Sequence, residues 1–195
     1  MIVVDLETTG LDSRTCSILS IGALDFDNPK NQFYEECRIW EGAHVQDEAL
    51  EVNGFTFESI VNSTKKTDKE ILESFIEWSK EVKYRTLAGE NPSFDRDFLK
   101  YTAYRYHINW TFAERTVDLH SVSYAHHLQN EKELPRKNTH SALNLAATLK
   151  YVGISDYSVP HHALEDTKLA AEAFFRLLYN KGLFEEFSQF KIPWL

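Results

Sequence analysis

The first residues of the chain constrain its fold more than any others. Ile2-Val3-Val4 is an apolar β-branched run that leads directly into Asp5 and Glu7. An apolar run without alternation is typical of a short strand buried on both faces. Successive side chains of a strand point to opposite faces, so Asp5 and Glu7 are predicted to share one face while Leu6 enters the core. The sequence therefore predicts a central strand that ends in two neighbouring carboxylates.

The pattern that follows predicts a meander of strands and then strands alternating with helices. Residues 17–26 and 32–39 have strand character, with a turn predicted at Asp27-Asn28-Pro29. Thr67 and Glu70 have the spacing of a capping box at the start of a helix. The other predicted elements are a strand at 85–89 and helices near 94–103, 117–128, 142–152 and 164–180. This order favours an α/β fold with a mixed sheet flanked by helices.

Length and composition are those of one folded unit. A chain of 195 residues can bury about 70% of the surface of its unfolded form, and we expect a single domain over residues 1–195. Residues 183–195 form a tail that is unusually apolar between Gln189 and Leu195. We expect the tail either to fold back on the body or to dock on a partner, such as a replication or repair protein or a second copy in a homodimer.

Charge and cysteine content limit the partners and the compartment. The net charge of −9 disfavours tight binding to long duplexes, but an enzyme that holds a phosphate through metal ions needs an acidic site. Cys16 and Cys37 fit no zinc or redox motif, which favours a reduced, cytoplasmic protein. The sequence contains no signal peptide pattern and no apolar run long enough for a membrane helix. His126 and His127 are expected on a helix surface.

Two further groups of acids lie at predicted element ends. Asp95 falls in the first turn of a helix that follows a strand, and Asp166 lies near the start of the last helix, five residues after His161. Each group has a plain structural interpretation: a strand end before a turn for Asp5 and Glu7, and acids that favour a helix N-terminus for the others. Three such groups in one chain, with a histidine in the loop after Pro160, instead favour a metal site with a general base.

Three motifs together resemble the DEDDh (DnaQ-like) 3′–5′ exonuclease family of the ribonuclease H-like superfamily. They are DLETTG at residues 5–10, N-x-x-F-D-x-x-F-L at 91–99, and H-x-A-x-x-D at 161–166. Leu143-Asn144-Leu145-Ala146, followed by Gly153-Ile154, also resembles the helix before the last motif in that family. The resemblance implies a mixed sheet of about five strands, with an antiparallel meander first and parallel strands after it.

The resemblance also implies a chemistry and a set of roles. Asp5, Glu7 and Asp166 would hold a first Mg²⁺ or Mn²⁺, and Asp95 would hold a second ion, with Asp5 bridging both. His161 would be the general base, which suits an imidazole at neutral pH. The implied reaction removes nucleoside 5′-monophosphates from 3′ ends of single-stranded DNA or RNA. His162, four residues before Asp166, is the alternative base, and His161 is preferred because it has the family spacing.

Substrate contacts are predicted from the same resemblance. The backbone at Thr8 and Thr9 would grip the terminal nucleotide, while Leu11 is either a wedge against its base or an ordinary core residue. Asn91 and Phe94 belong to the second motif, and Phe94 is either core or a platform for the sugar. The polar stretch 129–140, with Lys132, Arg136 and Lys137, either follows the substrate phosphates or is a solvated loop.

Three functional alternatives follow from these residues. The first is an active exonuclease, which retains all four acids and the histidine. The second is a catalytically silent binding module on the same fold, which would be expected to have lost one of the five. The third is a phosphatase acting on small nucleotides, which Glu7 disfavours because an Asp nucleophile would require Asp-x-Asp. One departure from the family pattern is Glu90, where many relatives have His, and this additional acid could alter the metal preference.

Overall fold

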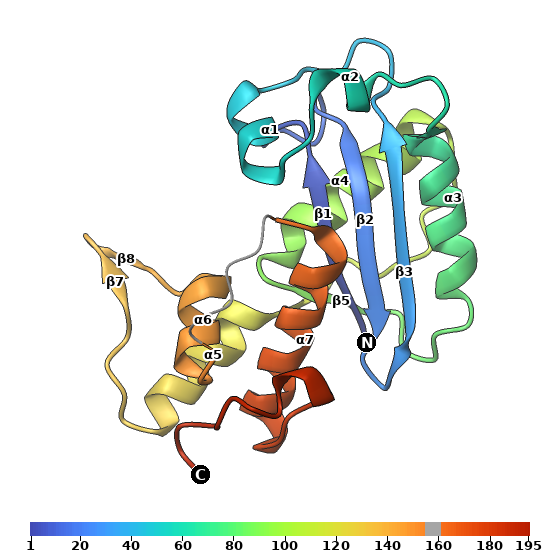
Figure 1. Cartoon of the computed structure of the whole chain (residues 1–195). Helices are drawn as coiled ribbons and strands as arrows, with labels where there is room; N and C mark the ends of the chain where they lie inside the picture. Colours follow the sequence, from blue (N-terminus) through green and yellow to red (C-terminus); the bar gives the residue numbers. More distant parts are fainter. Residues whose placement is uncertain (155–160) are drawn as a thin grey trace.

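The structure is a computed structural model that describes residues 1–154 and 161–195. Its centre is a six-stranded mixed sheet in the order β4-β3-β2-β1-β5-β6 (Figure 1). β1 to β3 form an antiparallel meander, and β1 also pairs in parallel with β5, which pairs in parallel with β6. The bounds of the sheet strands are β1 Ile2–Thr8, β2 Ile18–Asp25, β3 Asn28–Arg38, β4 Lys66–Thr67, β5 Leu87–Gly89 and β6 Val117–Asp118.

Helices cover both faces of this sheet (Figure 1). α3 and α4 pack with one face, and α7 crosses β1 and β2 on the other, with α5 and α6 beside it. The bounds are α1 Asp47–Asn53, α2 Phe57–Ile60, α3 Asp68–Ser79, α4 Pro92–Arg105, α5 Leu119–Gln129, α6 Leu145–Tyr151 and α7 Ala163–Tyr179. The predicted α/β fold is confirmed, and the sheet has six strands rather than five because the two-residue strands β4 and β6 extend its edges.

Several predicted boundaries are wrong for local reasons. The turn between β2 and β3 is at Phe26-Asp27, and β3 already begins at Asn28. Pro29 is tolerated there because β4 pairs only with residues 37 and 38, so this end of β3 is an edge without a neighbour in the described sheet. The helix predicted at 117–128 begins at Leu119, because Val117 and Asp118 pair with β5 and Asp118 caps the helix. The helix predicted at 142–152 begins after its cap Asn144.

Other local predictions are confirmed. Thr67 and Glu70 form the capping box of α3, and Gly153 follows α6 with a positive φ of 94°. Cys16 and Cys37 are buried and free. The predicted loop around Pro160 lies outside the described residues. The helices of the described part of the chain are too short or too polar to cross a membrane.

The apolar tail folds back on α7. Arg176 is 1% exposed and donates hydrogen bonds to the carbonyls of Phe187 and Phe190, at 2.9 and 3.0 Å, and to Glu172 at 2.6 Å. Trp194 donates to Asn180 at 2.6 Å. The first of the two alternatives for the tail therefore holds in the structure: Phe187 is buried, Phe190 and Trp194 pack on the core, and Leu195 is left 80% exposed.

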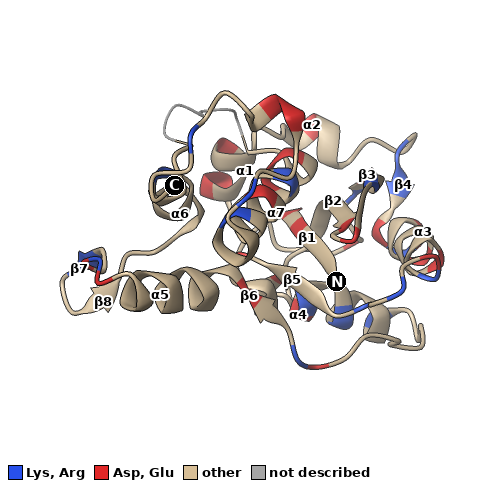
Figure 2. Cartoon of the chain, turned by 90° about the horizontal axis from the view of Figure 1, so that it is seen from below, with Lys and Arg blue, Asp and Glu red and all other residues tan. Residues whose placement is uncertain are grey.

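The segment between α5 and α6 and the position of His127 on α5 both differ from the sequence-based expectation. Residues 129–140 include one strand of a small exposed hairpin, β7 Arg136–Lys137 and β8 His140–Ser141, whose basic residues are blue in Figure 2. His127 is 2% exposed and stacks on Tyr151 with ring centroids 3.7 Å apart, so its predicted place on a helix surface is wrong. The aromatic ring of Tyr151 makes this position apolar, which no pattern around His127 indicates.

Candidate active site

The candidate site lies at the end of β1, where the strand presents its two acids to one face. Ile2, Val4 and Leu6 belong to the core on the α3 and α4 side, while Val3 belongs to the core on the α7 side. By strand alternation, Asp5 and Glu7 face the same side as Val3, which is the side covered by α7. The predicted geometry of the strand is therefore confirmed.

α7 reaches this strand end because of a glycine in β2. A Cβ on Gly22 would lie 2.2 Å from the carbonyl carbon of Ala163 and 2.3 Å from the nitrogen of Leu164, so only glycine allows this approach. Thr167 also donates its hydroxyl to the carbonyl of Gly22 at 2.9 Å. Gly22 is the partner of Asp5 in the β1–β2 register. The first turns of α7, which carry Asp166, are thus fixed beside Asp5.

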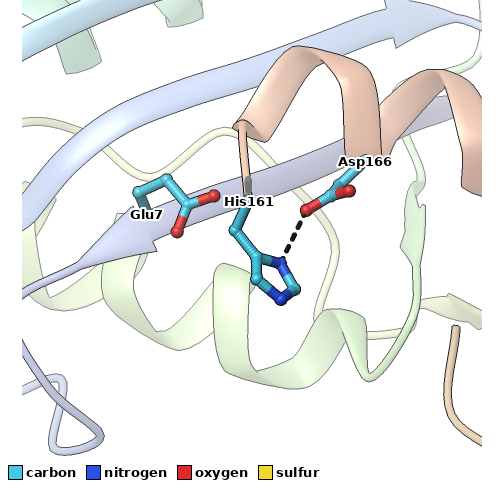
Figure 3. A group of neighbouring side chains, drawn as sticks. All are labelled: Glu7, His161 and Asp166. Atoms are coloured by element: carbon cyan, nitrogen blue, oxygen red, sulfur yellow. Dashed lines mark hydrogen bonds and ion pairs between the residues drawn. The ribbon is translucent and has the colours of Figure 1, made fainter. Parts of the chain in front are cut away.

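Three side chains converge at this point. Glu7, His161 and Asp166 each offer a ligand atom, and these atoms lie within 4.8 Å of one another (Figure 3). Nδ1 of His161 is 2.9 Å from Oδ2 of Asp166. An ionised carboxylate can only accept, so in the tautomer that matches this contact Nδ1 carries the proton and Nε2 is the basic nitrogen. The His161 side chain is 60% exposed, so water can reach it.

Asp95 approaches from the other side of the sheet. It lies in the first turn of α4, is 3% exposed, and accepts a hydrogen bond from the backbone nitrogen of Leu6 at 3.0 Å. This bond ties the start of α4 directly to β1. Asp95 is therefore held against the strand that carries Asp5 and Glu7, and the structure brings together all five residues that the motifs single out.

Electrostatics show how closely the carboxylates are grouped. Burial, and then the charges of Asp95, Glu7 and Asp166, raise the pKa of Asp5 well above its ordinary value. Burial and Asp166 raise the pKa of Glu7 to about 8. Burial, with a further contribution from Glu7, raises the pKa of Asp95 to about 8 despite the bond from Leu6. Grouped carboxylates of this kind ionise together only when a cation compensates their charge.

The residues fit divalent cations such as Mg²⁺ or Mn²⁺. Oε1 of Glu7 is buried and has no hydrogen-bond partner in the described part of the chain, which is costly unless a ligand completes it. Carboxylate oxygens are the ligands that Mg²⁺ and Mn²⁺ prefer. An orphaned buried oxygen among four grouped acids is thus what a site for hard cations requires.

The structure separates the two neighbouring histidines. His162 precedes α7 as its N-cap residue and stacks on Tyr34 of β3, with ring centroids 4.4 Å apart and an interplanar angle of 23°. The side chain of His161 contacts the carboxylate of Asp166, whereas His162 meets Asp166 through its backbone carbonyl, which accepts from the Asp166 nitrogen at 2.9 Å. The family spacing and the geometry therefore select the same histidine.

A narrow cleft beside Glu7, which we call the Leu11 slot, has a volume of about 300 Å³. Leu11 and Val52 are 79% and 59% exposed, and they line the slot with Ala49, Asn53 and Glu7. The interpretation of Leu11 as a core residue is therefore wrong. An exposed apolar wall next to an acidic site is suited to contact the flat face of a base.

The threonines next to this slot are committed to the protein. Thr9 is fully buried, and its hydroxyl donates to the carbonyl of His44 at 2.7 Å. Thr8 donates to the carbonyl of Gly10 at 2.8 Å, and its own carbonyl accepts from Asn53 at 3.1 Å. The backbone of Thr9 is occupied as well, because its nitrogen donates to the carbonyl of Ser17 at 2.9 Å and its carbonyl accepts from the nitrogen of Gln46 at 2.8 Å. The predicted grip of this backbone on a nucleotide is therefore not available at Thr9.

Asn91 and Phe94 of the second motif take part in contacts within the protein. Asn91 is exposed and has a left-handed backbone at φ 51°, with its nitrogen 3.3 Å from Asp118. Phe94 is partly buried and packs on Phe98 with ring centroids 4.8 Å apart. The core interpretation of Phe94 is therefore supported, and its packing fixes the turn that carries Asp95.

Glu90 couples to a different acid. Burial and the charge of Asp118 raise the pKa of Glu90 to about 7, and its Oε2 is buried with no hydrogen-bond partner among the described residues. The four acids of the site do not contribute to this shift. Glu90, the departure from the family pattern, therefore interacts with Asp118 at the β5–β6 end of the sheet.

Some residues at the site were missed by the sequence patterns. Asn53 links α1 to the carbonyl of Thr8, and Tyr34 supports His162. Gly54, with a φ of 74°, ends α1 as a left-handed cap and was a usable signal for this helix. Nothing local indicates Tyr34, because its partner lies 128 residues further along the chain.

Fold and site together define a class. A mixed sheet whose meander carries two acids on β1, with a third acid on α4 and a fourth on α7 beside a histidine, is the arrangement of a DEDDh nuclease of the ribonuclease H-like fold. The chain matches the family model RNase_T, described as an exonuclease family, over residues 2–174. It therefore belongs to the RNase_T exonuclease family.

Curated relatives of the chain include much longer proteins. It is 25% identical over 177 residues to a DNA polymerase III PolC-type of Thermotoga petrophila and 27% identical over 177 residues to that of Caldanaerobacter subterraneus subsp. tengcongensis. These alignments cover 91% of the chain but only 12% and 11% of the relatives. The chain thus corresponds to about an eighth of the length of these polymerases.

Solved structures share the fold at low identity. The nuclease domain of 3′hExo, a DEDDh family member bound to rAMP, superposes with a TM-score of 0.69 at 19% identity, covering 98% of this chain and 94% of that one. The zinc-bound form of an E. coli Exonuclease I complex with single-stranded DNA gives a TM-score of 0.73 at 17% identity, covering 92% and 40%. The resemblance inferred from the three motifs is confirmed by these matches and by the family model.

Proposed function

We propose that the chain is a divalent-metal-dependent 3′–5′ exonuclease that releases nucleoside 5′-monophosphates one at a time from single-stranded DNA or RNA. The observation that carries this proposal is the convergence of Glu7, His161 and Asp166, with Asp5 and Asp95 beside them, around a buried and unpartnered carboxylate oxygen. Membership of an exonuclease family supports the same reaction.

The acids and the histidine have distinct roles in this proposal. Asp5, Glu7 and Asp166 would hold one Mg²⁺ or Mn²⁺, and Asp5 and Asp95 a second. When bound, the cations would supply positive charge that offsets the carboxylates and the scissile phosphate. The four carboxylates come from β1, α4 and α7, so the substrate phosphate would be approached from both faces of the sheet.

His161 would act as the general base. Its Nδ1 donates to Asp166, which orients the ring and leaves Nε2 to take a proton from the attacking water. The water oxygen would form a bond to phosphorus, and the bond from phosphorus to the 3′ oxygen of the preceding nucleotide would break. A general base of this kind contributes about 10²- to 10⁴-fold to a rate.

The Leu11 slot would take the base of the terminal nucleotide. Leu11 and Val52 offer exposed apolar surface to a base, and Glu7 places the slot directly beside the acids. Exposed apolar walls favour stacking on the face of any base, so we expect little preference among the four bases. The exposed basic residues of β7 would follow the phosphates upstream.

The test uses 5′-labelled single-stranded DNA and RNA oligonucleotides with Mg²⁺ or Mn²⁺. We expect a ladder that shortens from the 3′ end in wild type and is absent in EDTA. Asp95→Asn should lose this activity by two orders of magnitude or more, whereas Asp97→Asn, on the same helix with its carboxylate 45% exposed, should retain it. No shortening by folded, metal-loaded wild type would refute the proposal and favour a binding module, and release of phosphate from mononucleotides alone would favour a phosphatase.

A further inference from the structure

A second cleft adjoins the Leu11 slot, and both are lined by Glu7 and Asn53. It has a volume of about 640 Å³, is bounded by Glu7, His161 and His162, and extends to Tyr34 of β3 and Lys65. The two histidines therefore stand at the border of an open space. The orientation of His161 and His162 must therefore be fixed by contacts with the sheet or with α7.

The sheet supplies such a support in a single row of residues. Asp5 of β1 is the register partner of Gly22 of β2, and Gly22 is the partner of Tyr34 of β3. Asp5 contributes to the acid cluster, Gly22 allows α7 to touch the sheet, and Tyr34 stacks under His162. Residues paired across adjacent strands share one face, so Tyr34 and Asp5 lie on the face covered by α7.

The ring of His162 depends on Tyr34 more than on hydrogen bonds. His162 is the N-cap residue of α7, but its side chain makes no capping bond. Its Nδ1 is buried without a hydrogen-bond partner in the described part of the chain. Within residues 1–154 and 161–195, this side chain interacts with the ring of Tyr34, at a centroid distance of 4.4 Å, and with the charge of Glu36.

Tyr34 is itself held in place by a short chain of polar contacts. Its hydroxyl donates to Oε1 of Glu36 at 2.8 Å, and Oε2 of Glu36 accepts from Lys65 at 2.6 Å. Lys65 also lies over the ring of Phe55, 5.1 Å from its centroid. The phenol ring is therefore a fixed surface for His162 to stack on.

From this geometry we propose that Tyr34 is a positioning residue for His161. The Tyr34–His162 stack fixes the residue next to His161 and so keeps the His161 ring against Asp166 and beside Glu7. This inference rests on the proposed role of His161 as general base. It assigns the stacking to the aromatic ring of Tyr34 and gives neither Tyr34 nor His162 a chemical step.

Four variants distinguish the contribution of the Tyr34–His162 ring pair from that of the polar groups on the two side chains. Tyr34→Phe and His162→Phe preserve a ring pair, while Tyr34→Leu and His162→Ala remove it. Small displacements of a catalytic group can reduce rates by up to about 100-fold. We therefore expect kcat to fall about tenfold or more in the two variants without a ring pair, with KM nearly unchanged, and to remain within about threefold of wild type in the two Phe variants.

A second measurement does not depend on turnover. In wild type and Tyr34→Phe, we expect Mn²⁺ to broaden the ring signals of His161 in NMR spectra, because the ring lies beside the acids. In Tyr34→Leu this broadening should weaken at saturating Mn²⁺, and the His162 ring signals should lose the upfield shift that stacking causes. Urea unfolding checks that each variant is folded.

The outcomes distinguish the two proposals. Wild type without exonuclease activity, but with His161 broadened in a Tyr34-dependent way, would refute the proposed function and leave the placement of His161 supported. Full kcat in Tyr34→Leu, or unchanged His161 broadening in that variant, would overturn the positioning role. Loss of activity in His162→Phe equal to that of His161→Ala would also overturn it, because His162 would then act chemically.

Discussion

Replacement of Glu7 by glutamine should stabilise the metal-free protein at alkaline pH while it abolishes activity. Glu7 is 8% exposed, and one of its oxygens is buried without a partner in the described part of the chain. Without a cation, its ionised form is opposed by burial and by Asp166. Glutamine has nearly the same shape and no charge, so the variant removes this repulsion and leaves the packing intact.

The raised pKa of Glu7 sets the size and the sign of the effect. The pKa rises from an ordinary 4.5 to about 8. A carboxyl group with a raised folded pKa stabilises the fold fully below its unfolded pKa, and this contribution is lost as the pH rises through the folded pKa. At about 1.4 kcal/mol per pH unit, ionisation of Glu7 lowers the free energy of unfolding by at most about 4 kcal/mol at pH 7.5. The stability difference between Glu7→Gln and wild type should therefore be at most about 4 kcal/mol at that pH.

The assay is urea unfolding in EDTA at pH 5 and at pH 8, with Glu81→Gln as a control at an exposed glutamate outside the site. Glu7→Gln should exceed wild type in the free energy of unfolding at pH 8 and nearly match it at pH 5. Addition of Mn²⁺ at pH 8 should reverse the order, since wild type gains more from the cation. The same difference at both pH values, or a Glu7→Gln variant less stable than wild type at pH 8, would refute the reasoning.

Three other substitutions test the packing that positions the site. Gly22→Ala should destabilise the fold by about 1–3 kcal/mol and reduce kcat, because the Cβ of the alanine would displace the start of α7. An unchanged free energy of unfolding together with an unchanged kcat would contradict this prediction. Arg176→Ala should lower the free energy of unfolding in urea by about 3–5 kcal/mol, because the variant leaves Glu172 buried without its cation and releases the tail. A decrease below about 1 kcal/mol would contradict this prediction. Leu11→Ala should raise KM for oligonucleotides several-fold, with stability unchanged because Leu11 is 79% exposed. The control is Leu178→Ala, at another exposed leucine. An equal rise of KM in both variants would exclude the Leu11 slot as the site that binds the base.

Local patterns identified the elements whose causes are local. The apolar run Ile2-Val3-Val4 predicted β1 and the face shared by Asp5 and Glu7, because side-chain alternation is a property of any strand. Thr67 and Glu70 predicted the start of α3, because a capping box satisfies backbone groups within one turn. Helix starts at Asp118 and Asn144 were misplaced by two or three residues, because tertiary strand pairing and caps decided them.

The motifs identified the residues of the site, because the ability of a carboxylate to bind a cation and of a histidine to accept a proton depends on the residue type. Tertiary structure decided how they meet. α7 comes close to β2 only because Gly22 lacks a Cβ where Ala163 passes, and His162 turns onto Tyr34 while His161 turns to Asp166. The contacts of Gly22 with Ala163 and of Tyr34 with His162 join residues more than 100 positions apart in the chain. Their energies depend on packing between elements, and for that reason the sequence specified the acids and the base while the fold set their geometry.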